Sequence, residues 1–261
     1  IRLLANSPLQ VNVDLLRLDT HRSKNTSEQH LDTFYRYFSE IKDNNYDALI
    51  ITGAPLAHLE YENVGYWQEL EVILDWAESH VTSTLFSCWA AHASLFHHYG
   101  LKRELKKDKL CGVFKHQCFS EHGALTRGFD DDFLVPHSRY GNISLEQIAT
   151  VPELEVLAGS DKVGAYLVKN QSGSQVFITG HPEYEADTLA GEYARDVAKG
   201  AGAAIPENYF LNDDPKIEPS KTWQSHAFLL FSNWLNYYVY QTTPYDIKLI
   251  SQDVRTNNYA E

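Results

Sequence analysis

The sequence predicts an α/β protein built on a doubly wound, mostly parallel sheet with helices on both faces. Three observations point to this fold class. Apolar runs of strand length alternate with longer amphipathic runs over residues 11–99, and the connections between them are only a few residues long. Parts of the apolar runs are continuous, as in strands that are buried on both faces. Strands and helices in this rhythm form parallel sheets through right-handed crossovers.

In the first hundred residues, apolar runs predict three strands, and apolar residues three and four positions apart predict the helices between them. The expected strands are residues 11–18, 46–55 and 81–88. The expected helices are residues 25–41, residues 63–80 and the run that follows Cys88. Thr26 or Ser27 is the expected N-cap of the first helix, because both are good capping residues.

The rest of the chain predicts short strands and then two helices. Five segments bounded by Gly, Ser or Asn have strand character, and one of them should extend the main sheet. These segments are residues 111–119, 133–140, 154–160, 164–170 and 174–180. Helices are expected after the motif GHPE and over residues 222–241. No repeat, linker or low-complexity segment divides the chain, so we expect residues 1–261 to form one domain.

The predicted C-terminal helix carries a stripe of apolar residues with spacings of four, three, four and three. The stripe consists of Trp223, Ala227, Leu230, Trp234 and Tyr237. This spacing suits packing into the core, and the alternative is a seam between two copies of the chain in a homodimer.

Charge and cysteine usage exclude several classes of function. Acidic residues outnumber basic ones 35 to 22, which argues against a nucleic-acid partner. The basic stretch 101–110 is expected to be a solvated helix face or loop. No apolar run approaches the roughly 20 residues that span a bilayer, so no membrane partner is expected. Three cysteines without paired spacing suit a reducing compartment, so we expect a cytoplasmic protein without a zinc site.

The ends of three predicted strands bring candidate catalytic residues together. Ligands of open parallel sheets gather at the carboxyl ends of the strands. One strand stops at Gly53, another at Cys88, and a third leads into His181 and Glu183. A cysteine at a strand-to-helix turn lies at a helix N-terminus, which favours the thiolate. The backbone N–H of Trp89 is then placed to stabilise an oxyanion.

Taken alone, Cys88 fits a buried small side chain as well as a nucleophile. His181 as a base and Glu183 as the group that orients it favour the nucleophile. Cys111 and Cys118 lack such a turn and are expected to be structural. The remaining histidines, including the pair HH at residues 97–98, have no partner that the sequence identifies, so they are expected at the surface or satisfied in the core.

The cysteine turn and the later GHPE motif resemble the class I glutamine amidotransferases, which use a Cys-His-Glu triad. Those enzymes usually carry Gly two residues after the cysteine, where this chain has Ala90. The chain more closely resembles the homoserine O-acyltransferases of methionine biosynthesis, which share that fold and triad. The segments DALIITGAPL, VTSTLFSCWAA and FITGHPEYEADTLAGEYARDV occur in family order, and the likeness runs from about Asn6 to Ile247. Family members have a further N-terminal strand, which we expect to be missing from this numbering.

The resemblance implies ping-pong acyl transfer through a thioester. Cys88 would be the acyl-thioester nucleophile, His181 the general base and Glu183 its partner. The co-substrate would be an acyl-CoA, with no metal and no tightly bound cofactor. The same resemblance places the amino-acid substrate at Arg195, whose guanidinium would grip the α-carboxylate, and at Lys109 and Ser138.

The acyl donor and the acceptor remain open at this stage. In the resembled family a small Gly after the TGAP segment leaves room for succinyl, and a Glu there favours acetyl; this chain has Ala57. One methyl group is worth only about 1 kcal/mol, so neither donor is excluded. Homoserine is the favoured acceptor, and serine, feeding cysteine synthesis, is the alternative. A glutamine amidotransferase-type hydrolase and a non-catalytic binding protein are the other hypotheses.

Overall fold

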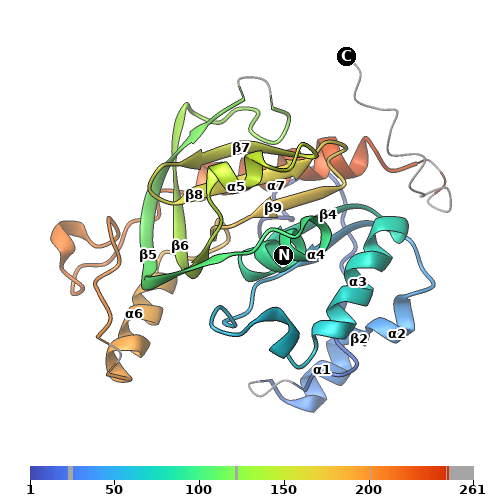
Figure 1. Ribbon diagram of the computed structural model, residues 1–261, viewed down its shortest axis with the longest axis horizontal. Helices are drawn as coiled ribbons and strands as arrows, with labels where there is room; N and C mark the ends of the chain where they lie inside the picture. The colour runs from blue at the N-terminus through green and yellow to red at the C-terminus, as the bar shows by residue number, and fades with distance from the viewer. Residues whose placement is uncertain (23–25, 121–122, 201, 245, 247–261) are drawn as a thin grey trace.

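The computed structural model describes residues 1–22, 26–120, 123–200, 202–244 and 246. A seven-stranded sheet forms its centre, in the order β3-β4-β9-β8-β7-β5-β6 (Figure 1). The strands are β3 (Tyr46–Ile51), β4 (Val81–Ser87), β5 (Glu104–Cys118), β6 (Asp132–Asn142), β7 (Leu154–Ser160), β8 (Gly164–Asn170) and β9 (Gln175–Ile178). The sheet is mixed: β3, β4 and β9 are parallel, and the other neighbours pair antiparallel.

Helices cover both faces of the sheet, as the sequence predicts. Helices α3 (Trp67–His80) and α4 (Trp89–Tyr99) pack on one face, and α7 (Gln224–Asn233) with the π-helix η3 (Trp234–Tyr240) packs on the other. Successive strand residues point to opposite faces. In β4, Leu85 joins the core beneath α7, and Phe86 joins the core beneath α3 and α4. The predicted α/β class with helices on both faces is therefore confirmed.

The N-terminal region forms a small separate sheet. Strands β1 (Leu15–Arg17) and β2 (Tyr35–Tyr37) pair in parallel, and neither joins the main sheet. The predicted helix over residues 25–41, whose first residue lies outside the described residues, is wrong as one element. Helix α1 (Glu28–Phe34), capped by Ser27, stops at β2, and α2 (Phe38–Ile41) follows. No residue of α1 is buried, so its apolar positions contribute little to holding a continuous helix.

The middle of the chain contributes more to the main sheet than expected. All five predicted short strands belong to it, and β7 and β8 have the predicted bounds. The basic stretch 101–110 is mostly strand, since β5 begins at Glu104, and not a helix face or loop. The shorter elements of the described chain are η1 (Tyr61–Asn63), α5 (Leu145–Ala149), α6 (Thr188–Ala198) and η2 (Leu211–Asp213).

The apolar stripe of the C-terminal helix belongs mostly to the core of the chain. Trp223, Ala227, Leu230 and Trp234 are each no more than 2% exposed. The stripe's last member, Tyr237, is half-buried and accepts a hydrogen bond from Arg127 Nη1 at 2.7 Å. The stripe therefore packs inside one chain, and a homodimer stays a prediction.

No helix among the described residues is long and apolar enough to cross a membrane.

Candidate active site

Cys88 forms the turn between β4 and α4. Its backbone has φ 53° and ψ −115°, a conformation that residues other than glycine seldom adopt. Its N–H donates to the Ile178 carbonyl at 2.7 Å, which ties the turn to the end of β9. Since α4 begins at Trp89, the Trp89 N–H lies in the first turn, where backbone donors have no partner within the helix. The thiol thus stands at the positive end of a helix, beside a donor suited to an oxyanion.

The loop after β3 packs its backbone directly against this turn. A Cβ atom added to Gly53 would lie 3.0 Å from Cys88 Cβ and 3.3 Å from Trp89 N. Both distances are at or below close van der Waals contact. Glycine is therefore the residue that lets the loop approach the cysteine.

His181 and Glu183 form a hydrogen-bonded pair at the end of β9. His181 Nδ1 and Glu183 Oε1 are 2.7 Å apart. The segment is a turn, in which Tyr184 N donates to the His181 carbonyl at 3.2 Å, and the carboxylate still reaches the ring. The His181 N–H also donates to the Pro136 carbonyl at 2.8 Å. These bonds fix the backbone on which the imidazole stands.

The protonation of His181 reflects its neighbours. Burial alone would lower the pKa of this imidazole. The negative charge of Cys88, a hydrogen bond with the Cys88 side chain and the contact with Glu183 outweigh burial and raise the pKa to about 10. This shift favours the protonated ring when Cys88 is charged. An adjacent imidazolium is the partner that a reactive thiolate requires.

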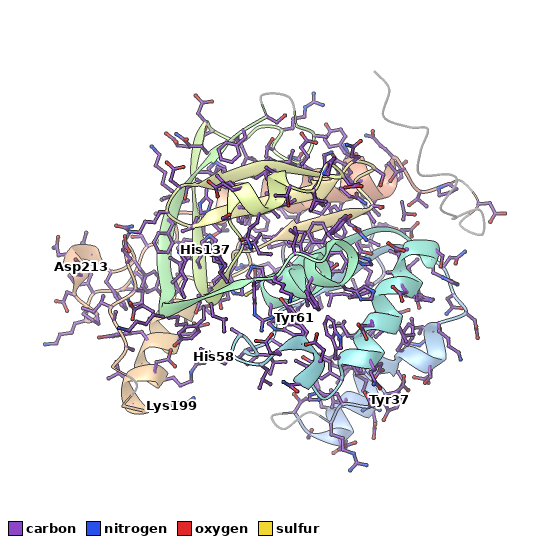
Figure 2. All side chains as sticks on the ribbon, viewed as in Figure 1. Tyr37, His58, Tyr61, His137, Lys199 and Asp213 are labelled. Atoms are coloured by element: carbon purple, nitrogen blue, oxygen red, sulfur yellow. The ribbon has the colours of Figure 1, made fainter. Side chains whose placement is uncertain are left out.

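A buried arginine lies within electrostatic reach of the same cysteine. The Arg139 guanidinium donates to the Val163 carbonyl at 2.6 Å and to His137 Nδ1 at 3.3 Å. Burial lowers the pKa of Arg139 to about 10, and the negative charge of Cys88 opposes this shift. His137 in turn shares a hydrogen bond with His116, and Figure 2 labels His137 on the sheet. The sequence analysis missed Arg139, although an arginine inside a predicted strand was itself a signal.

Two of the predicted substrate residues converge on one carboxylate, Glu192 of α6. Lys109 Nζ lies 3.1 Å from Glu192 Oε2, and Ser138 Oγ donates to the same oxygen. Tyr184 donates to the other oxygen, Oε1, at 2.7 Å. The Tyr184 ring also stacks on His181 with centroids 4.2 Å apart. Glu192 thus connects Lys109 and Ser138, through Tyr184, to His181, and it was not predicted from the sequence.

Arg195 lies farther out on the same helix. Its side chain is 54% exposed, and its Nε donates to Asp196 Oδ1 at 3.2 Å. Asp196 also binds Lys109, at 3.1 Å. The structure therefore links Arg195 to Lys109 through Asp196. The spacing of Glu192, Arg195 and Asp196 by three and four residues was the available signal that they share a helix face.

Ala57 lies in the segment between β3 and α3, where Figure 2 labels His58 and Tyr61. Arg103 Nη2 donates to the Ala57 carbonyl at 3.1 Å, and its guanidinium lies 4.1 Å from the Tyr61 ring centroid. His58 packs on Tyr140 of β6 with ring centroids 4.4 Å apart. The backbone at Ala57 is thus anchored to the antiparallel part of the sheet.

The other two cysteines differ from Cys88. All three are unpaired. Burial raises the pKa of the Cys111 thiol to about 11, and burial also raises the pKa of Cys118. Both lie on β5, away from a helix start. Burial therefore disfavours the thiolate at Cys111 and at Cys118.

Comparison with known proteins identifies the family. The family model for homoserine O-succinyltransferase matches residues 1–245. The chain belongs to this family. It is 78% identical over 261 residues to a homoserine O-succinyltransferase of Pseudoalteromonas translucida, covering all of this chain and 83% of that protein. It is 56% identical over 251 residues to that of Shewanella amazonensis, covering 96% of this chain and 79% of that protein. The family predicted from the sequence is confirmed, and the chain is a transferase.

Solved structures show the same fold at low identity. A glutamine amidotransferase from Thermotoga maritima is 14% identical, has a TM-score of 0.53, and covers 87% of this chain and 98% of its own. A glutamine amidotransferase from Methylobacillus flagellatus is 11% identical, also at a TM-score of 0.53, and covers 85% of this chain and 94% of its own. The predicted class I glutamine amidotransferase-like fold is confirmed. The family match does not favour a serine acetyltransferase or a glutamine-hydrolysing enzyme.

Proposed function

We propose that this chain transfers a succinyl group from succinyl-CoA to the side-chain hydroxyl of L-homoserine through a thioester on Cys88. The observation that carries the proposal is Cys88 in a left-handed strand-to-helix turn beside the His181–Glu183 pair, in a chain of this family. Succinyl is chosen because the relatives are named for it. At Ala57 no carboxylate side chain opposes the succinyl carboxylate.

The first half-reaction acylates the enzyme. The Cys88 thiolate attacks the thioester carbonyl, and the Trp89 N–H stabilises the oxyanion. The carbon–sulfur bond to CoA breaks, and His181 gives its proton to the departing sulfur. Exchange of one thioester for another is nearly isoenergetic, so the step needs no metal and no tightly held cofactor.

The second half-reaction moves the acyl group to oxygen. The neutral His181 takes the proton of the homoserine hydroxyl, which attacks the acyl carbon and releases the Cys88 thiolate. Lys109, Ser138 and Arg195 bind the amino acid. Because Glu192 and Asp196 bind the Lys109 ammonium, a substrate group that binds it exchanges these contacts for its own. We place this activity in the cytoplasm, which the three unpaired cysteines support.

Mass spectrometry of the intact protein tests the proposal. Brief exposure to succinyl-CoA should add one succinyl group, and homoserine should discharge it faster than serine. Acetyl-CoA is tested in parallel as the other acyl donor. Glutamine is tested as well, with release of ammonia as the readout. The adduct should be absent in Cys88→Ala and present in Cys111→Ala, the matched control. An adduct or full turnover in Cys88→Ala refutes the thioester, and faster discharge by serine refutes the acceptor.

A further inference from the structure

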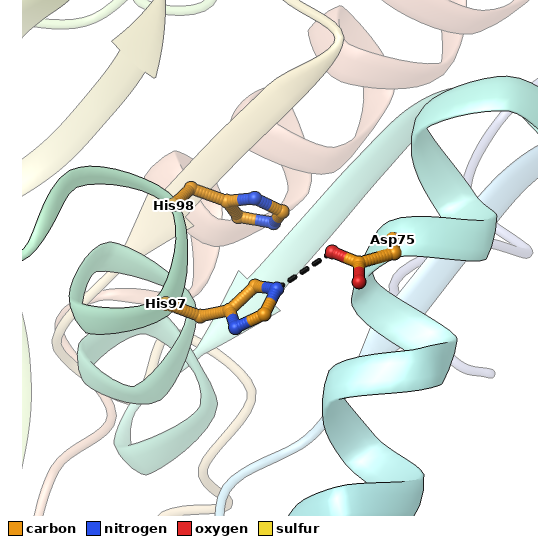
Figure 3. Close-up of side chains that lie close together, drawn as sticks. All are labelled: Asp75, His97 and His98. Carbon is orange, nitrogen blue, oxygen red and sulfur yellow. Dashed lines mark hydrogen bonds and ion pairs between the residues drawn. The ribbon is translucent and has the colours of Figure 1, made fainter.

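Helices α3 and α4 face each other through a cluster of histidines and carboxylates that plays no part in the proposed reaction. Asp75 lies on α3, and His97 and His98 lie in the last turn of α4. One nitrogen or oxygen atom from each of these side chains lies within 4.8 Å of the others. Figure 3 shows both imidazole rings turned towards the Asp75 carboxylate.

The two rings differ in how their Nε2 atoms are satisfied. His97 Nε2 lies 2.7 Å from Asp75 Oδ1. His98 Nε2 is buried and has no hydrogen-bond partner, in a side chain that is only 8% exposed. A buried nitrogen without a partner costs free energy unless some ligand satisfies it.

The Nδ1 atoms face a second layer of carboxylates. His97 Nδ1 lies 3.6 Å from Glu71 Oε1, and His98 Nδ1 lies 3.4 Å from Glu78 Oε1. Glu71 and Glu78 lie four residues before and three residues after Asp75, so the three carboxylates share one face of α3. Metal-binding histidines commonly donate their second ring nitrogen to a carboxylate, which orients the ring and raises its basicity.

We propose that Asp75, His97 and His98 form a binding site for a divalent transition-metal ion of the Zn²⁺ type, which clamps α3 to α4. Two imidazole nitrogens and one carboxylate oxygen are a common zinc donor set, with water as the fourth ligand. Ligand atoms around tetrahedral zinc lie about 3.3 Å apart for bonds of about 2.0 Å. His97 Nε2 and Asp75 Oδ1 are 2.7 Å apart, and the ligand atoms of the three side chains lie within 4.8 Å of one another. These separations bracket the zinc value, so small side-chain rotations complete the site.

The surroundings also favour a cation. Three carboxylates offset the charge of the metal, and the last turn of α4 contributes the negative end of its helix dipole. No zinc site was expected from the sequence, because the three cysteines lack paired spacing. Asp75 and His97 are 22 residues apart, and only the packing of the two helices brings them together.

Calorimetric titration of the metal-free full chain with Zn²⁺ tests the proposal. The wild type should bind one Zn²⁺ per chain, and binding should be lost in Asp75→Asn and in His98→Gln. Glu71→Gln should weaken the affinity by about 10- to 100-fold, as expected for a carboxylate behind a ligand. The matched control is His226→Gln, since His226 also faces an aspartate, Asp130 at 3.2 Å, but without a second histidine. This control should bind Zn²⁺ as the wild type does.

Two further measurements separate this site from the catalytic thiol and from loss of folding. Cys88→Ser should retain the Zn²⁺ site, and Co²⁺ bound to the wild type should show no thiolate charge-transfer band. Zn²⁺ should raise the melting temperature of the wild type and not that of Asp75→Asn, whose side chain is 67% exposed. Failure of the wild type to bind Zn²⁺ overturns the proposal. So does binding by Asp75→Asn and His98→Gln that equals that of the wild type, or loss of binding in Cys88→Ser.

Discussion

Lys109 Nζ lies 3.1 Å from Glu192 Oε2, so a lysine predicted to contact substrate is held by a carboxylate of the protein itself. Burial would lower the pKa of Lys109, but Glu192 and Asp196 raise it above its usual value. Lys109 therefore stays charged while it is half-buried. The position of its ammonium depends on the helix that carries both carboxylates, α6.

Glu192→Gln should lower kcat/KM for homoserine about 10- to 100-fold. The substitution weakens hydrogen bonds to a charged group, each worth about 1.5–3 kcal/mol, and it leaves three donors without a shared anion. Steady-state kinetics with varied homoserine measure the effect. Asp196→Asn is the control, because Asp196 binds Lys109 while Ser138 and Tyr184 bind Glu192, and this substitution should cost less. An equal loss in both variants contradicts the positioning role of Glu192.

Gly53→Ala should slow acylation of Cys88 about tenfold with little change in the free energy of unfolding. The added methyl would meet Cys88 Cβ at 3.0 Å and push the nucleophile by a few tenths of an ångström. Pre-steady-state release of CoA measures the step. Gly65→Ala is the control, because a Cβ there meets nothing within 4 Å. Wild-type acylation in Gly53→Ala would show that the loop yields without moving the cysteine.

The pKa of His181 should fall in Cys88→Ala. In the wild type the Cys88 charge and hydrogen bond, together with Glu183, outweigh burial and raise this pKa to about 10; without Cys88, only Glu183 opposes the effect of burial. Imidazole NMR resonances followed against pH measure the change. Because the folded-state pKa lies above the reference value of 6.5, the stabilisation is complete below pH 6.5 and is lost as pH rises towards 10. An unchanged His181 titration in the variant contradicts the pairing.

Acid should destabilise the fold through buried histidines. Burial lowers the pKa values of His98 and His116 to about 4, from a reference of 6.5. Both rings stay neutral in the folded protein and gain protons on unfolding, so the stability present above pH 6.5 is lost as pH falls towards 4. Each group costs about 2 kcal/mol at about pH 5.

Denaturant unfolding in the presence of a chelator measures this loss. His98→Gln removes one of the two groups, so its loss of stability between about pH 7.5 and about pH 5 should be about 2 kcal/mol smaller than that of the wild type. His226→Gln removes a histidine in another part of the chain and is the matched control. The same pH profile in all three proteins would show that His98 is not held neutral.

Short, clearly bounded strands could be predicted from the sequence. β7 and β8 are short, mostly apolar runs bounded by Gly, Ser or Asn, and their bounds match. The helix expected over residues 25–41 failed because the apolar side chains of its first half, in α1, are not buried in a core; Phe34 is 58% exposed. Pairing with β1 extends residues 35–37 instead.

The candidate site was predictable where strand ends define it and not where tertiary contacts do. Cys88 and His181 follow strands, so the rule for parallel sheets found them. Glu192 and Arg139 gain their importance from partners that are distant in the chain, such as Lys109, 83 residues before Glu192. No local pattern reports such a contact. For the same reason the Asp75–His97 pair became visible only in the folded chain.

The pairing of β4 with β9 has a mechanical consequence for the reaction. Ser87 and Ile178 are partners in register, and the chain continues by one residue to Cys88 and by three to His181. The Cys88 sulfur and the His181 imidazole therefore belong to residues that follow two adjacent strands. The backbones of adjacent strands lie about 4.8 Å apart, the narrowest spacing in a sheet. Twisting or bending of the whole sheet carries both groups together and leaves their separation unchanged. Arg195, which we propose binds the amino acid, stands on α6 and not on these two strands.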